Sequence, residues 1–234
     1  MSRPRYKVDE NYIAFSDIMT CLMIIFLFVA ISYIMEVFST NFIKDEMYNT
    51  ITEKMINELE KNNVKLGKDL SLKFFNNDKN NKDVLFETGA EEMTENFKTK
   101  ISEIWPLYQN IITQDTFLNY ISEIRIEGHT DTLPPKNSIS NSYEYNLNLS
   151  SLRAQQVLKF IKDQPSYLSL DGTKKSRLQY LLTANGMSYS RALNDSNEVA
   201  YLSNSKSINQ DKSRRVEFRI VTTNQKLIES LIKK

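Results

Sequence analysis

The hydrophobic pattern of the chain is uninterrupted near the N-terminus and periodic after it. From Tyr12 to Met35 nearly every residue is apolar, and the only charge in this run is Asp17. A helix needs roughly 20 apolar residues to cross a hydrocarbon core of about 30 Å, so the run predicts a transmembrane helix over residues 12–35. No small-residue cleavage site follows it, which favours an uncleaved anchor over a secretory signal peptide.

Charges on the two sides of this run predict its orientation. Arg3, Arg5 and Lys7 precede the run, whereas Glu36 is the first charge after it. The positive-inside rule then keeps residues 1–11 in the cytoplasm and sends the rest of the chain to the other side of the membrane.

Asp17 is the candidate for chemistry within the predicted span. An acid at the centre of a membrane helix costs about 2.5–3.5 kcal/mol, and Asp17, about 7–8 Å past Tyr12 along the helix, incurs a reduced cost. A low dielectric disfavours the ionised carboxylate, which is the condition for reversible protonation. The alternative interpretation is an interfacial acid that reaches the headgroups or caps the helix together with Ser16.

The segment 36–69 is polar but periodic, which predicts a stalk helix that ends near Asn62 and Gly67. Apolar residues recur at every fourth position: Ile43, Met47, Ile51, Met55 and Leu59. This stripe either packs on the chain's own domain or forms a parallel dimer contact outside the membrane. We favour the dimer contact.

Residues 70–222 predict an α/β domain, because short strand patterns alternate with helical ones. The strands are expected at Leu70–Phe75, Val84–Phe86, Ile124–Glu127, Leu181–Met187 and Val216–Ile220. One helix is expected to begin at a Thr94 cap and to be kinked by Pro106, and another to carry Ala154 to Ile161. Residues 223–234 are expected to form a closing helix. The predicted fold class is therefore a mixed α/β sandwich behind a transmembrane helix and a stalk helix.

Composition narrows the function. A net charge of +1 offers no broad basic field, so direct binding of nucleic acid is not expected. Cys21 is the only cysteine, which excludes an intrachain disulfide. His129 is the only histidine, and no metal site or catalytic arrangement is expected around it. We expect its ring to support a loop, Arg214 and Arg215 to form ion pairs at the edge of the domain, and the protein not to be an enzyme.

Several motifs, in a fixed order, resemble the OmpA-like peptidoglycan-binding family. The core of the resemblance is Ile126-Glu127-Gly128-His129-Thr130-Asp131, followed by Tyr145-Asn146, Leu149-Ser150 and Arg153-Ala154. Weaker matches are Val84–Ala90 and Ser213–Glu217. The resemblance covers roughly Leu70 to Thr222 and implies an OmpA-like fold for this segment.

The resemblance also implies a binding site, in which Asp131 and Arg153 bracket the diaminopimelate of a peptidoglycan stem peptide. A zwitterionic amino-acid end needs one anion for its ammonium group and one guanidinium for its carboxylate, so the residue types fit. The further residues expected to line this site are Thr130, Tyr145, Asn146 and Leu149. Alternatively, Asp131 is a loop acid bonded to its own backbone, and Arg153 forms an ion pair on a helix surface.

The segment Phe15-Ser16-Asp17-Ile18-Met19-Thr20 resembles the motif of stator B subunits, in which the Asp carries the coupling ion. Three features resemble the B components of Zorya-type anti-phage defence systems more than the flagellar B subunits. They are the short N-terminal tail, the small total length and the segment Tyr12–Asp17. The resemblance implies a bacterial inner-membrane protein with a periplasmic C-terminal domain, present as a homodimer inside a ring of MotA-like, ZorA-type subunits. H⁺ is the expected coupling ion, with no further cofactor. A flagellar stator subunit and a passive peptidoglycan tether remain as alternatives.

Overall fold

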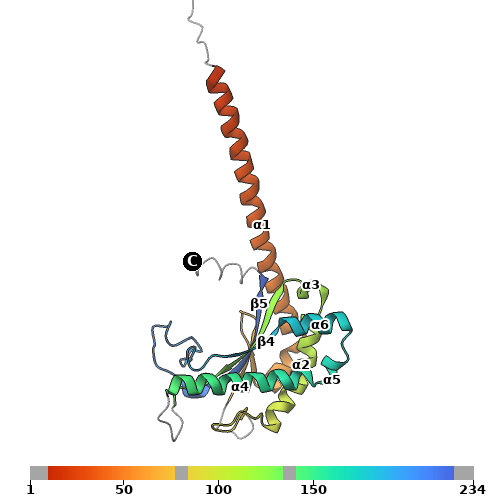
Figure 1. Ribbon diagram of the computed structural model, residues 1–234, viewed down its shortest axis with the longest axis vertical. Coiled ribbons are helices and arrows are strands. Elements are labelled where there is room, and N and C mark those ends of the chain that lie inside the picture. The colour runs from red at the N-terminus through yellow and green to blue at the C-terminus, as the bar shows by residue number, and fades with distance from the viewer. Residues whose placement is uncertain (1–9, 77–83, 134–140, 224–234) are drawn as a thin grey trace, which may run out of the picture. The chain divides into compact units, whose positions relative to one another are not determined.

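The computed structural model describes residues 10–76, 84–133 and 141–223, and it divides the chain into two compact units, 1–42 and 43–234. The basic residues that predicted the orientation and the expected closing helix at 223–234 lie outside the described residues, apart from Thr223. Helix α1 (Glu10–Lys61) contributes residues to both units (Figure 1).

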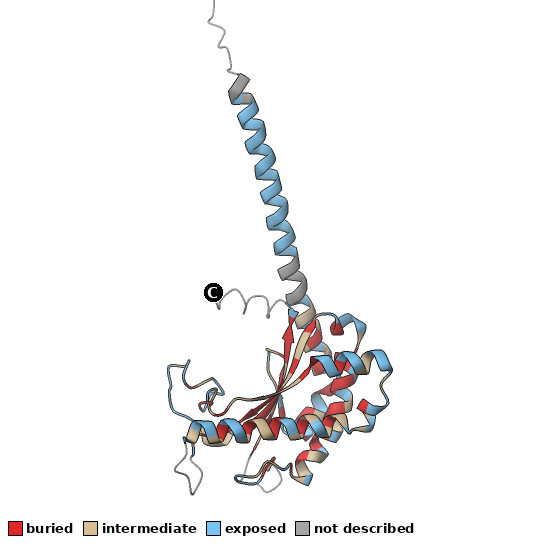
Figure 2. Ribbon diagram, in the orientation of Figure 1, coloured by how far each residue is buried: buried red, intermediate tan, exposed pale blue. Residues whose placement is uncertain are grey.

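The first unit is the N-terminal part of α1. Within it, Ala14–Met35 is a stretch of 22 residues with a mean hydropathy of 2.6, long and apolar enough to cross a membrane. The residues of this stretch are exposed along its length (Figure 2). The hydroxyls of Thr20 and Ser32 donate to the carbonyl oxygens of Ser16 and Phe28, each at 2.8 Å, so these polar groups are satisfied within the helix.

The second unit takes the rest of α1 into its own core. Met47, Ile51, Met55 and Leu59 are buried, and they belong to one apolar cluster with residues of the sheet and of the later helices. The favoured prediction of a dimer stripe is therefore wrong, because the domain itself supplies the apolar surface that covers these side chains. The helix ends at Lys61, and Asn63 (φ 54°) turns the chain into a strand that the sequence pattern did not predict.

The described residues of the domain form a five-stranded sheet in the order β1-β2-β5-β3-β4. The strands are β1 (Val64–Leu66), β2 (Ser71–Phe75), β3 (Ile121–His129), β4 (Leu182–Gly186) and β5 (Arg215–Thr222). Strands β3 and β4 run parallel, whereas the β1–β2, β2–β5 and β3–β5 pairs are antiparallel. The predicted strand at Val84–Phe86 is reduced to a single bridge between Phe86 and Met93.

The helices of the domain follow the predicted alternation with strands. They are α2 (Glu95–Ile112), α3 (Asp115–Leu118), α4 (Ser142–Lys162), α5 (Pro165–Leu168), α6 (Gly172–Leu181) and α7 (Gln210–Ser213). The Thr94 side chain accepts a hydrogen bond from the Phe97 amide, as expected of an N-cap, and α2 continues through Pro106. The mixed α/β architecture is thus confirmed.

The two faces of the sheet differ in chemistry. On β5, Phe218 points to the helical side and packs against Trp105 and Tyr108 of α2. Its neighbours Glu217 and Arg219 point to the opposite side, because successive side chains of a strand alternate between faces. The apolar core therefore lies between the sheet and the helices, and the other face of the sheet carries charges.

Two glycines allow α4 to lie directly on the sheet. Gly128 of β3 and Gly186 of β4 are opposite each other in the parallel register. A Cβ atom at Gly128 would collide with the carbonyl oxygen of Ser150, and one at Gly186 with the Ser151 hydroxyl. This close approach brings the N-terminal half of α4 beside the carboxyl end of β3, where most of the predicted site residues lie.

Candidate functional site

Ser188 joins the carboxyl end of β3 to helix α4. The Thr130 amide donates to the Ser188 carbonyl at 2.9 Å, and the Ser188 amide donates to the Ser150 hydroxyl at 3.0 Å. The Ser188 hydroxyl in turn donates to the Tyr143 carbonyl at 3.0 Å. The position of Thr130 relative to α4 is therefore set by hydrogen bonds, and Ser188 is a residue that the motif reading did not single out.

The Thr130 side chain carries an unsatisfied group. The residue is 3% exposed, and its hydroxyl has no hydrogen-bond partner among the described residues. Leaving a buried hydroxyl unpaired costs about 1–3 kcal/mol, so a water molecule or a ligand atom is expected to bond to it.

Asp131 lies next to this hydroxyl in sequence and is held from two sides. Its carboxylate is 2.8 Å from Nη1 of Arg214 and accepts a hydrogen bond of 3.1 Å from the Leu133 amide. The alternative interpretation of Asp131, a loop acid bonded to the neighbouring backbone, is therefore correct for its contact with Leu133 but leaves out its ion pair with Arg214. The predicted ion pair of Arg214 is formed here, and α7 adds a contact between Gln210 and Thr132.

Arg153 is buried, with 8% of the residue exposed, so it does not lie on the helix surface as the alternative interpretation required. Its Nε donates to the Ala90 carbonyl at 2.9 Å and its Nη2 to the Glu87 carbonyl at 3.1 Å, while the guanidinium lies 4.8 Å from the centre of the Phe86 ring. Arg153 therefore fastens the segment Glu87–Ala90 to α4.

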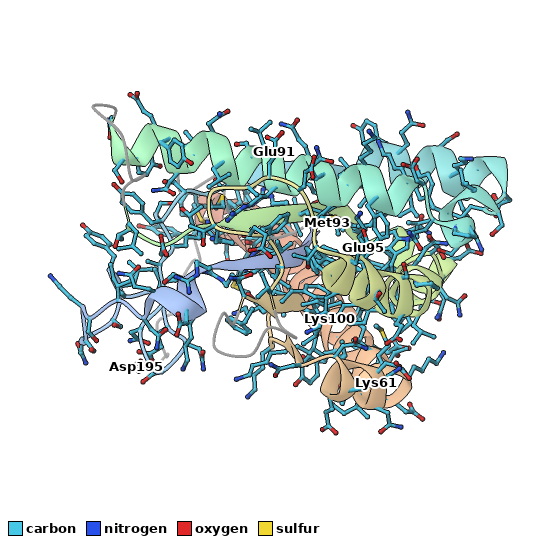
Figure 3. The ribbon with its side chains drawn as sticks, turned by 90° about the horizontal axis from the view of Figure 1, so that it is seen from below. Lys61, Glu91, Met93, Glu95, Lys100 and Asp195 are labelled. Carbon is cyan, nitrogen blue, oxygen red and sulfur yellow. The ribbon has the colours of Figure 1, made fainter. Side chains whose placement is uncertain are left out.

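Residues 89–92 and α4 line an open pocket of about 390 Å³. Tyr145 and Leu149 line it from α4, and Ala90 and Glu91 line it from the facing segment, which runs along α4 in Figure 3. The volume lies within the range of about 300–1,000 Å³ that is typical of ligand sites.

The predicted site residues thus form two neighbouring groups. Thr130, Asp131 and Asn146 gather at the loop after β3, where the Asn146 amide donates to the Leu133 carbonyl at 3.3 Å and the Ser142 carbonyl at 3.0 Å. Tyr145, Leu149 and Arg153 belong to the pocket along α4 or to its support. No sequence motif identified Glu91 as a lining residue of this pocket. Its position there depends on the hydrogen bonds by which Arg153 holds the preceding segment Glu87–Ala90.

A second cluster of titratable groups lies on the charged face of the sheet. His129 is the last residue of β3, not a loop residue, and its Nε2 is 3.3 Å from a Glu127 oxygen. The two carboxylate oxygens of Glu217 accept hydrogen bonds of 2.6 Å from Arg215 and Arg219. Arg215 therefore forms an ion pair as predicted, but in the central strand β5 instead of at the edge of the domain.

This cluster has the donor atoms of a metal site but the bonding of an ion-pair network. Potential ligand atoms of Glu127, His129 and Glu217 lie within 4.8 Å of one another. Burial and the nearby Arg215 lower the pKa of His129 to about 4, so its ring is neutral at pH 7. Burial alone would raise the pKa of Glu217, but Arg215 chiefly lowers it to about 2. The guanidinium groups already occupy both Glu217 oxygens, which leaves the carboxylate poorly suited to a cation.

In the helical unit, Asp17 is the only ionisable side chain, apart from Cys21 and Tyr33, between Ala14 and Met35. Ser16 precedes it and Thr20 lies one turn further on, and the Thr20 hydroxyl is engaged by the Ser16 carbonyl. The carboxylate is therefore the principal charge-bearing group that this apolar helix presents.

These features define a class: a helix suited to a membrane that carries a single acid, followed by an α/β domain with a candidate ligand pocket beside its α4 helix. Along 96% of its length the chain is 26% identical to the Zorya protein ZorB of Escherichia coli (strain ATCC 8739, Crooks), of which it covers 93%. This similarity confirms the resemblance to the Zorya-type B component. No family model matches the chain.

Solved structures with a similar fold have lower identities. A MotB-like protein from Desulfovibrio vulgaris is 18% identical with a TM-score of 0.46, over 77% of this chain and 94% of that one. The OmpA-like domain of FopA1 from Francisella tularensis is 19% identical with a TM-score of 0.37, over 69% and 82%. The periplasmic domain of Helicobacter pylori MotB is 18% identical with a TM-score of 0.38, over 69% and 83%.

Proposed function

We propose that this chain is the peptidoglycan-anchored stator subunit of a proton-driven inner-membrane motor that acts in anti-phage defence. The observation that carries the proposal is the similarity to ZorB over nearly the whole chain, from the acid-bearing apolar helix to the last strand of the domain. In this proposal the N-terminus is cytoplasmic, the domain is periplasmic, and two copies lie inside a ring of MotA-like, ZorA-type subunits.

The wall-binding site is proposed at the carboxyl end of β3 and along α4. Asp131 would bind the ammonium group of a diaminopimelate residue and Arg153 its carboxylate, with Thr130, Tyr145, Asn146 and Leu149 around them. The unpaired Thr130 hydroxyl supports this placement, because a ligand atom there would satisfy a buried group. The adjoining pocket of about 390 Å³ supplies room for the stem peptide.

Asp17 is proposed to carry the coupling ion, and that ion to be H⁺. One carboxylate suffices to take and release a proton, whereas a metal cation needs several oxygen ligands, and the apolar run offers few of them. The membrane potential supplies about 2.3 kcal/mol per charge and 100 mV, which is the driving force for rotation of the ring. No metal and no organic cofactor takes part, and no catalysis is proposed.

The decisive experiment combines phage plating with a wall-retention assay on the full chain expressed with its neighbouring genes. Asp17→Asn removes the titratable carboxyl and keeps its size, so protection against phage should be lost while retention on isolated cell walls stays unchanged. Thr130→Val removes only the unpaired hydroxyl. It should weaken wall retention about tenfold, which corresponds to one lost hydrogen bond.

Asp115→Asn serves as the control, because this acid is exposed in the short helix α3 and belongs to neither proposed site. It should match the wild type in both assays. Full protection against phage in cells with Asp17→Asn or Asp17→Leu would contradict proton coupling through Asp17 and would favour a passive peptidoglycan tether. If wall retention were unchanged in both Thr130→Val and Arg153→Ala, the proposed location of the binding site at α4 and β3 would be wrong.

A further inference from the structure

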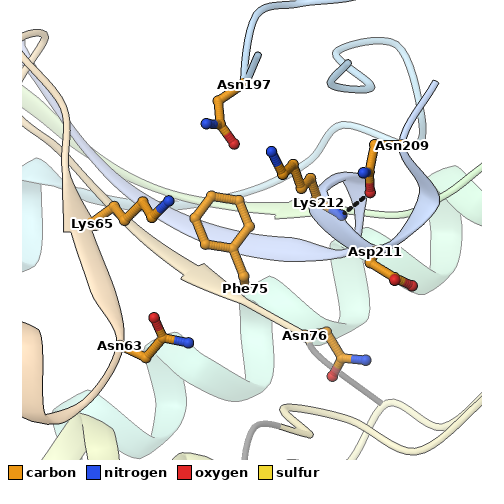
Figure 4. Close-up of a pocket in the computed structure, with 8 residues that line it drawn as sticks. All are labelled: Asn63, Lys65, Phe75, Asn76, Asn197, Asn209, Asp211 and Lys212. Atoms are coloured by element: carbon orange, nitrogen blue, oxygen red, sulfur yellow. Dashed lines mark hydrogen bonds between the residues drawn. The ribbon is translucent and has the colours of Figure 1, made fainter. Parts of the chain in front are cut away.

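A second pocket lies on the other face of the sheet, where β2 ends. It has a volume of about 260 Å³ and is formed between β1, β2 and the segment around α7 (Figure 4). Its lining includes Asn63, Lys65, Phe75 and Asn197. It shares no lining residue with the pocket along α4.

The floor of this pocket is an aromatic ring in an unusual place. On β2, Leu72 and Phe74 point into the apolar core, whereas Lys73 and Phe75 point to the charged face of the sheet. The Phe75 side chain is only partly buried there, and the ammonium group of Lys65 lies 5.8 Å from its ring centre. A ring that faces a pocket and not the core is available for stacking.

Two amide groups approach the ring from distant parts of the sequence. In the part of the chain that the structure describes, neither the Asn63 nor the Asn197 side chain makes a hydrogen bond, and both lie around Phe75 in Figure 4. Each has a left-handed backbone, with φ of 54° and 63°, which by itself favours asparagine. That local preference explains each residue singly, but not why both amides meet at one exposed ring.

The charges around the pocket favour an anion. Lys65 forms no ion pair with any described residue, and Lys212 adds a second ammonium group. The one carboxylate among the described lining residues, Asp211, is 2.7 Å from the guanidinium of Arg214, which it shares with Asp131, and the two lysines outnumber it. An acidic group of a ligand would meet a net positive charge here.

We propose that this pocket binds a single acidic, N-acetylated sugar unit, the chemistry of a muramic acid residue. The apolar face of the sugar ring would stack on Phe75, because its polarised C–H groups are attracted to the negative face of an aromatic ring. The two amides match the hydroxyl and acetamido groups, and Lys65 binds the carboxylate. The volume lies below the range of about 300–1,000 Å³ for larger ligands, which limits the occupant to one ring.

The test is saturation-transfer NMR on the full chain in lipid nanodiscs, with N-acetylmuramic acid, N-acetylglucosamine and glucose as separate probes. N-acetylmuramic acid should give the strongest transfer and glucose the weakest. Phe75→Leu should weaken the binding of both acetylated sugars roughly fivefold through loss of stacking, and Asn197→Ala should weaken it by a similar factor. Lys65→Gln should weaken only the binding of N-acetylmuramic acid.

Thr130→Val is the control that separates this site from the wall-binding site along α4, and it should leave sugar transfer unchanged. Fluorescence of Trp105, the only tryptophan, shows whether each variant is folded. Absence of transfer in the wild type would overturn the proposal, as would unchanged transfer in both Phe75→Leu and Asn197→Ala. Equal transfer from glucose and N-acetylmuramic acid would overturn the assignment to an acidic sugar.

Discussion

The apolar helix exposes hydrophobic side chains, whereas the domain buries charged ones. In the helix, Ile25 is 56% and Phe28 66% exposed, whereas in the domain Glu127 is 0% and Glu217 1% exposed. The helix therefore needs surroundings that accept apolar side chains, namely lipid or other membrane helices. The domain satisfies its buried charges by itself, with Arg215 and Arg219 around Glu217.

The two regions are therefore sensitive to different substitutions. A buried charge remains in place only while its partners are present, because an uncompensated charge in a low dielectric is expensive. An exposed apolar side chain in the helical unit contributes nothing to the core of the domain, so its removal should not affect the unfolding of that core. Three measurements, in order of expected effect, sharpen this contrast.

Glu217→Gln should give the largest loss of stability. The substitution leaves Arg215 and Arg219 without the carboxylate that both of them contact, which should lower the free energy of unfolding by about 3–5 kcal/mol. Urea unfolding of the full chain in detergent, followed by the fluorescence of the buried Trp105, measures this change. Glu95→Gln is the control, since the Glu95 side chain is 89% exposed in its ion pair with Lys98 and should change the value by less than about 1 kcal/mol. Equal unfolding midpoints for the two variants would contradict the account of a closed charge network.

Ile51→Ala and Ile25→Ala form a matched pair on the same helix. Ile51 is fully buried in the domain core, so its truncation should lower the free energy of unfolding by about 2–5 kcal/mol. Ile25 lies in the apolar helix of the first unit, and its truncation should leave the transition reported by Trp105 unchanged. A similar loss in both variants would mean that the two units unfold as one.

The pH dependence of stability should follow His129. Its folded pKa of about 4 lies below the ordinary value of 6.5, so the unfolded chain binds a proton in this interval that the folded chain does not. The contribution of the neutral ring is complete above pH 6.5 and is lost as the pH falls towards 4, on the order of 3 kcal/mol in total. Urea midpoints between pH 7.5 and 4.5 measure the slope.

His129→Asn should flatten that slope, because asparagine does not titrate. The lowered pKa of Glu217 acts in the same direction but at lower pH, from its ordinary value of 4.5 down to about 2, so the two groups are separable. A slope that is the same in the wild type and in His129→Asn would assign the pH dependence to other groups.

Local patterns predicted most of the elements. The Thr94 cap, the alternation of β5 and the helical spacing of α4 depend on neighbours in sequence, and the structure places all three as expected. The stripe on α1 was assigned to the wrong partner, because a helical period reports that one face avoids water but not which surface covers it. Strand β1 has only three residues, too few for a periodic signal.

The order of the motifs predicted which residues belong to the site, but not how they are arranged in space. That Thr130 is linked to α4 through Ser188 depends on two glycines in different strands, Gly128 and Gly186, that let the helix approach. That Arg153 holds the segment Glu87–Ala90 depends on chain far from it in sequence. The spacing of residues along the sequence predicts neither of these contacts.

The amino-acid sequence alone predicts an apolar run with one acid, and an α/β domain with most of its strands and the Thr94 cap. Which charges are buried together, and which side chains line the pockets, depends on how the strands and helices pack against one another. The physical reason is that hydrophobic period and turn chemistry act over a few residues. Ion pairs such as Arg219 with Glu127, and hydrogen bonds such as Arg153 with Ala90, require strands and helices to be placed against one another first.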